Sequence, residues 1–175
     1  CIAAILNISE LSKKIFSAEE KEMKESTLLG SEFESSLRVL LLLDELEHKS
    51  LDEIQIACID FIAIYGADFM ILDENLHGNG LFRFSEFSAK SKLVTRSLKK
   101  LVLDGFITFT ANKKGYLYSI NSQGREIANN LNASYSEEYR IAVREVNTAF
   151  PSLNASAMQK QIYKTTMNSL EAYNE

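Results

Sequence analysis

Eight basic residues between positions 83 and 114 have the types and spacing that most clearly point to a chemistry, the binding of phosphates. They are Arg83, Lys90, Lys92, Arg96, Lys99, Lys100, Lys113 and Lys114. Only Glu86 and Asp104 oppose them, so the segment has a net charge of +6 and the rest of the chain −11, within a total of −5. Such an asymmetry indicates a surface that attracts polyanions, which the acidic net charge of the whole chain hides.

The cations in the middle of this segment fall on one side of a helix expected over residues 86–103. At about 100° per residue, one arc of this helix is cationic and carries Lys92, Arg96, Lys99 and Lys100. The opposite arc is apolar and carries Phe87, Val94, Leu98 and Leu101. The apolar side would pack against the protein, while the cationic side could contact phosphates on a nucleic acid, together with Lys113 and Lys114. The plainer alternative, a solvated helix face without a ligand, stays open.

The residues that catalysis or metal binding would need are scarce. Histidine occurs only at His48 and His77, and neither a phosphate-binding loop nor a dinucleotide-binding glycine motif is present. Asp68, Asp73 and His77 could be drawn as metal ligands or as part of a small hydrolase, but their spacing is irregular. We therefore expect no catalytic residues, no metal and no cofactor. Cys58 is set among isoleucines and is expected to behave as a small buried apolar residue.

The elements that would position the basic residues can be read from periodicity and turn residues. One proline and seven glycines in 175 residues favour long helices. We expect helices over residues 2–16, from 36 to about 49 and from 51 to about 66, the last opened by a capping box of Ser50 and Glu53. A loop follows over residues 73–84. Residues 106–110 and 116–120 have the composition of a β-hairpin, and helical character continues from Asn121 or Ser122 toward Val146 and again after Pro151.

This order of elements predicts a fold that is mainly α with a small β-hairpin. Two helices, a longer third helix and a hairpin are typical of a winged helix-turn-helix, in which the third helix can enter a major groove and the hairpin is the wing. We expect an N-terminal helical extension over residues 1–32, the winged helix-turn-helix over 33–120 and a C-terminal helical region over 121–175.

Residues 37–43 are apolar on nearly every side of their expected helix, which leaves two interpretations open. The helix could lie in a core shared with the terminal helices, or part of its surface could be covered by a partner protein. The apolar stretch 54–72 is interrupted by Gln55, Asp60 and Asp68, so it does not predict a membrane span. With two cysteines far apart in sequence, the chain fits a cytoplasmic location.

The chain also resembles the middle components of three-component ABC-ATPase (ABC-3C) conflict systems, the group that includes the Lamassu type of bacterial defence. The resemblance is carried by a pattern of residues from about 28 to 146. It comprises 36–44, Ser50-Leu-Asp52, Asp60-Phe-Ile62, Gly66-Ala-Asp68, Leu76-His77 followed by Arg83, and 101–107 with the hairpin. Gly78-Asn79-Gly80 departs from the prolines expected after the Leu-His pair, and residues 1–27 are not covered.

The resemblance implies a winged-helix accessory subunit that sits between an SMC-like coiled-coil ATPase and an effector, often a nuclease, in antiviral or anti-plasmid defence. We therefore expect a non-enzymatic adaptor whose first two core helices and termini bind the partner proteins, and whose third helix and wing contact DNA without sequence specificity. The alternative is a free-standing, homodimeric winged-helix transcriptional regulator, which would read paired half-sites through the same helix.

Overall fold

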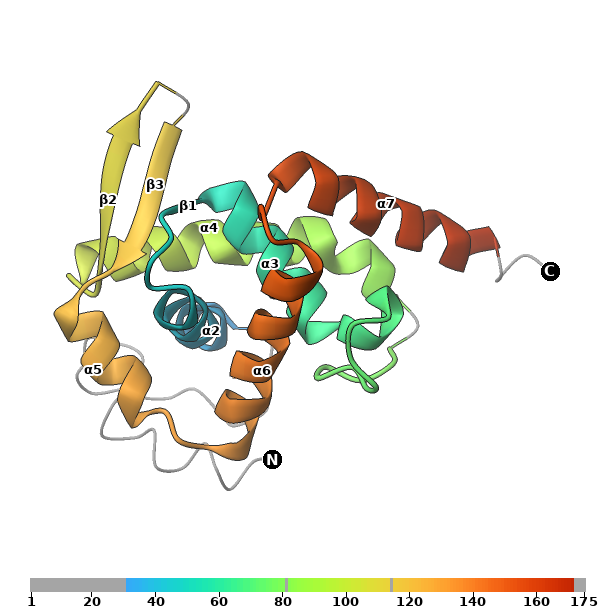
Figure 1. Cartoon of the computed structure of the whole chain (residues 1–175), viewed down its shortest axis with the longest axis horizontal. Coiled ribbons are helices and arrows are strands. Elements are labelled where there is room, and N and C mark those ends of the chain that lie inside the picture. Colours follow the sequence, from blue (N-terminus) through green and yellow to red (C-terminus); the bar gives the residue numbers. More distant parts are fainter. Residues whose placement is uncertain (1–30, 81, 114, 172–175) are drawn as a thin grey trace.

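The computed structural model describes residues 31–80, 82–113 and 115–171, so the helix predicted over residues 2–16 lies outside them. The described chain is mainly helical with one small antiparallel sheet, which confirms the predicted fold class. Its elements, shown in Figure 1, are α2 (Glu32–Glu45), β1 (Leu51–Asp52), α3 (Glu53–Ile64), the 3₁₀ turns η4 (Gly66–Phe69) and η5 (Arg83–Glu86), α4 (Phe87–Leu103), β2 (Ile107–Asn112), β3 (Gly115–Ile120), α5 (Ser122–Asn130), α6 (Ser134–Ala149) and α7 (Ala155–Glu171).

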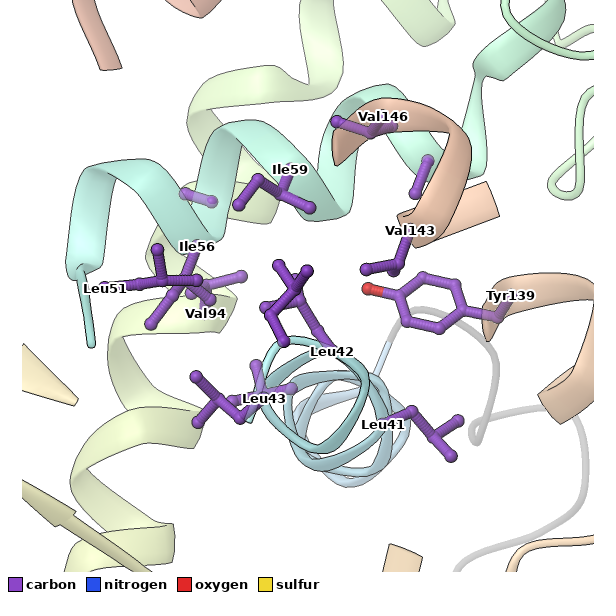
Figure 2. Close-up of a cluster of buried hydrophobic side chains, with 14 of the residues drawn as sticks. Leu41, Leu42, Leu43, Leu51, Ile56, Ile59, Val94, Tyr139, Val143 and Val146 are labelled. Atoms are coloured by element: carbon purple, nitrogen blue, oxygen red, sulfur yellow. The ribbon is translucent and has the colours of Figure 1, made fainter. Parts of the chain in front are cut away.

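Helix α2 is the centre of the hydrophobic core. Five consecutive residues, Val39 to Leu43, are buried, and because a helix turns about 100° per residue they cover its whole circumference. Figure 2 looks along α2 and shows side chains of α3, α4 and α6 directed at it, among them Ile59, Val94 and Val143. Of the two interpretations of the apolar run, the structure supports a core formed by the chain itself.

The start of α3 corrects the predicted capping box. The box consists of Asp52 and Gln55 instead of Ser50 and Glu53: the Asp52 carboxylate accepts from the Gln55 amide N–H at 2.8 Å, and the Gln55 side chain accepts from the Asp52 N–H at 2.9 Å. The helix starts later because Leu51 and Asp52 are extended and pair with Tyr118 and Leu117 of β3. This short strand β1 was not predicted.

The hairpin of β2 and β3 was predicted correctly, and it forms a sheet with the order β1-β3-β2. Ile107 pairs with Ile120 and Phe109 with Tyr118, which places these four side chains on one face. Ile107, Tyr118 and Ile120 are buried against the body of the protein. The outer half of the hairpin projects away from the helices (Figure 1).

The C-terminal helices complete the same core. Asn121, one of the two predicted starts of this helix beside Ser122, caps α5. The helical character predicted to continue toward Val146 is interrupted over residues 131–133, so that α5 and α6 are separate helices. Helices α5 and α6 pack against α2, and α6 and α7 pack against α3. The predicted domain boundary at residue 120 stays a prediction.

Gly124 offers a test of how tightly α5 is packed against the hairpin. A methyl group at this position would approach the Phe106 carbonyl oxygen to 2.1 Å and the Ile120 side chain to 2.9 Å. Alanine normally stabilises a helix relative to glycine by up to about 1 kcal/mol, but here we expect Gly124→Ala to lower the free energy of unfolding by about 1–3 kcal/mol. Urea unfolding measures this, with Gln123→Ala on the exposed side of the same helix as the control. Equal stability of the two variants would contradict the close packing.

Candidate nucleic-acid interface

Helix α4 divides into a buried and a cationic side, as its sequence predicted. Val94, Leu98 and Leu101 are buried against α2 and α3. The side chains of Lys92, Arg96 and Lys99 are exposed on the other side. We call these three residues the α4 cations.

The remaining basic residues of α4 and of the turn before it contact acidic side chains of the same chain. Arg83 donates two hydrogen bonds to Asp68, at 2.6 and 2.8 Å, in the paired geometry that arginine favours with carboxylates. Lys90 lies 3.4 Å from Glu86 and over the ring of Tyr65, and Lys100 lies 3.4 Å from Asp104. Arg83 and Lys90 therefore hold the loop and η5 against the core, and the α4 cations are the better candidates for phosphate contact.

The end of α4 sets the position of the hairpin relative to the α4 cations. Gly105 has φ +77, a left-handed conformation that favours glycine. The amide N–H of Gly105 donates to Val102 and that of Phe106 to Leu101, which is the Schellman pattern of a helix end. The Asn121 side chain donates to the Gly105 carbonyl at 2.7 Å and so ties the turn to the end of β3. The hairpin therefore leaves the end of α4 at a fixed angle.

At the tip of the hairpin, Lys113 is exposed, and Lys114 lies outside the described residues. Thr108, Thr110 and Asn112 are exposed on the strand that leads to the tip. The α4 cations and Lys113 thus lie on the two elements that a winged helix-turn-helix uses to contact DNA, and the arrangement is compatible with that fold.

A buried polar cluster at the other side of α2 was not predicted. Arg38 of α2 donates to both carboxylate oxygens of Asp60 in α3, at 2.8 and 3.2 Å, and to Glu34 one turn earlier. The Tyr139 hydroxyl of α6 donates to Asp60 at 2.7 Å. Arg38, Asp60 and Tyr139 are each at most 3% exposed. One arginine and one aspartate within apolar helices are the signal that could have predicted this pair, because a buried charge needs a partner.

The protonation states of this cluster follow from its surroundings. Burial raises the pKa of Tyr139 well above its usual value, and the Asp60 carboxylate raises it further, so the phenol keeps its proton and donates. Burial lowers the pKa of Arg38, but the attraction of Asp60 outweighs it and the net pKa is raised. The cluster is therefore an ion pair with a donated phenol hydrogen bond, which joins α2, α3 and α6.

The loop after α3 is also held by polar contacts. Asn75 donates to Asp68 and accepts from the Ala67 N–H, and His77 lies 2.8 Å from the Tyr135 hydroxyl at the start of α6. Asp68 and His77 thus face different partners, and among the described residues no group of three or more histidines, cysteines and carboxylates could hold a metal ion. These contacts fix the loop, which in turn supports η5 and the start of α4.

Cysteine chemistry is disfavoured at Cys58. The residue is fully buried, as expected, and burial raises the pKa of its thiol to about 12, with a further contribution from Asp52. The thiol is therefore neutral near pH 7 and is a poor nucleophile.

The comparisons with known proteins identify one family. The family model of the ABC-three component (ABC-3C) system Middle Component 2 matches residues 28–172 of the sequence. Neither a curated protein nor a solved structure matches the chain. The match confirms the predicted resemblance, and the residues that carried it include the polar groups described above: Arg38, Asp60, Asp68, His77 and Arg83.

Proposed function

The chain belongs to the Middle Component 2 family of ABC-three component systems, and we propose that it is a non-catalytic adaptor of a Lamassu-type defence complex. An accessory subunit of such a system works with partner components. The proposed partners are an SMC-like coiled-coil ATPase and an effector nuclease in the cytoplasm.

In the described part of the chain, no helix combines the length and apolar character that crossing a bilayer requires.

The surface that binds these partners is proposed on the terminal helices. The sequence predicted partner binding by the first two core helices together with the termini, and the burial of α2 and most of α3 by the chain itself favours the terminal part of that prediction. Apolar side chains are exposed instead on α6 and α7, where Ile141 is 46% and Tyr163 66% exposed.

The second part of the proposal is that α4 and the hairpin contact the DNA backbone. The observation that carries it is the exposure of all three α4 cations on one side of a helix whose other side is buried. Lysine and arginine contacts to phosphates give affinity without sequence information. Arg96 is the main side chain on this face that is suited to recognising a base, guanine. Because the other contacts expected from this face are to phosphates, the binding is expected to be nonspecific and sensitive to salt.

Reversing the charge of two α4 cations tests the DNA contact. We expect Arg96→Glu/Lys99→Glu to weaken binding to a 30-base-pair duplex by about 100-fold at low salt, because two phosphate contacts are replaced by repulsion. The slope of log affinity against log salt concentration is expected to fall by about 2, since each phosphate contact contributes about 0.9. Fluorescence anisotropy between 50 and 200 mM salt measures both quantities.

The matched control for charge is Lys160→Glu/Lys164→Glu, which changes two exposed lysines of α7. Both double variants change the net charge of the chain by the same amount. If the two variants weaken DNA binding equally, the effect is that of net charge alone and α4 is not the contact surface.

Co-expression with the genomic neighbours tests the adaptor role. Purification through a tag on this chain is expected to recover a large coiled-coil ATPase in a fixed ratio. A stable homodimer that elutes alone and selects an operator sequence would instead favour the transcriptional regulator.

A further inference from the structure

Two exposed aromatic side chains lie together on the outer half of the hairpin. Phe109 of β2 and Tyr116 of β3 share one face of the sheet, because Phe109 pairs with Tyr118 and Tyr116 pairs with Ala111. Their ring centroids are 5.2 Å apart with an angle of 87° between the ring planes. Phe109 is 50% and Tyr116 56% exposed. The pair is therefore arranged as a unit, yet about half of its surface remains accessible.

The position of the pair explains this exposure. Ile107, Tyr118 and Ile120 lie on the same face and are buried, which shows that this face packs against the helices at the base of the hairpin. Phe109 and Tyr116 continue the face outward, where the hairpin projects beyond the body (Figure 1). A cross-strand aromatic pair stabilises a hairpin, but that role alone does not require large rings on a part of the sheet that is open to solvent.

The geometry of the pair leaves flat surfaces for a ligand. In an edge-to-face pair, one ring directs its edge at the other, so the first ring keeps both faces uncovered by its neighbour. Lys113 is exposed four residues after Phe109, and Thr108 and Thr110 present hydroxyl groups on the opposite face. A narrow ribbon with a cation and two aromatic rings suits a nucleotide, whose phosphate and base need those two kinds of contact.

We propose that Phe109 and Tyr116 form a stacking platform for an unpaired nucleobase. This inference rests on the proposed contact of α4 with DNA and names the form of DNA that the chain prefers. Bases inside a duplex are already stacked on each other, and bringing one out has a cost in free energy. A junction between duplex and single strand offers an unpaired base at no such cost. With α4 on the duplex phosphates, the hairpin would hold the first unpaired base, so the chain binds junctions in preference to blunt duplexes.

The test compares two DNA probes of equal duplex length, a blunt duplex and one with a ten-nucleotide single-stranded extension. A 2-aminopurine base at the first unpaired position reports stacking, because its fluorescence is quenched when it stacks on an aromatic ring. We expect the wild-type full chain to bind the junction probe about tenfold more tightly than the blunt duplex and to quench the 2-aminopurine. Phe109→Leu/Tyr116→Leu keeps apolar side chains without flat rings and is expected to remove both the preference and the quenching.

Two further variants separate the possible outcomes. Phe109→Tyr/Tyr116→Phe retains both rings and is expected to keep the preference for the junction probe. Thr108→Ala/Thr110→Ala changes only the opposite face of the same strand and is expected to keep it as well. Circular dichroism confirms that each variant is folded. Equal affinity of the wild-type chain for the two probes, or full quenching by the leucine variant, would overturn the stacking platform while leaving the α4 contact intact. Absence of binding to both probes would instead overturn the proposed DNA contact itself.

Discussion

Replacing Asp60 with asparagine is expected to lower the free energy of unfolding by about 3–5 kcal/mol. The substitution removes the negative charge that neutralises Arg38 at a position where both side chains are at most 3% exposed. It also replaces an acceptor of the Tyr139 hydroxyl hydrogen bond. Among the described residues, the guanidinium would remain buried with Glu34, at the edge of the cluster, as its acidic partner. Urea unfolding followed by far-UV circular dichroism measures the loss.

Two companion variants identify the ion pair as the cause. Tyr139→Phe removes one hydrogen bond and no charge, so we expect a loss of about 1 kcal/mol. Arg38→Met/Asp60→Leu removes both charges and replaces them with apolar side chains, and its stability is expected to lie within about 2 kcal/mol of the wild type. A loss below about 1 kcal/mol for Asp60→Asn would show that Arg38 remains hydrated in solution.

The elements that the sequence predicted best are those set by local signals. Helix α4 was predicted from the regular spacing of its apolar residues, and the hairpin from two runs of β-branched and aromatic residues. Each of these signals acts within a few residues of the element that it defines. The same holds for Asn121, which caps α5 through the amide of Gly124 three residues later.

The elements that were missed depend on contacts between distant residues. Strand β1 has only two residues and exists because Leu51 pairs with Tyr118, 67 positions later in the chain. The capping box consequently lies two residues later than predicted, because the extended Asp52 is the residue that caps α3. The interruption at residues 131–133 contains neither glycine nor proline, so no local breaker marked it.

The candidate site was predicted in the same partial way. Periodicity placed the α4 cations on one side of a helix, and the structure gives their exposure. Sequence alone could not separate them from Arg83, whose partner Asp68 lies 15 residues away and meets it only through the fold of the loop. The aromatic pair on the hairpin was likewise hidden, because it depends on the register of β2 with β3.

The apolar run of α2 leads to the last prediction, because a helix covered by its own chain and a helix covered by a partner respond differently to substitution. We expect Leu42→Ala to lower the free energy of unfolding of the isolated chain by about 2–5 kcal/mol, since Leu42 is fully buried at the centre of the core (Figure 2). Leu103→Ala is the matched control: Leu103 is 85% exposed at the end of α4, and its loss is expected to stay within about 0.5 kcal/mol. If Leu42→Ala left the isolated chain equally stable and weakened only the assembly with partner components, α2 would be an interface helix. Urea unfolding of the isolated chain distinguishes the two roles before any partner is known.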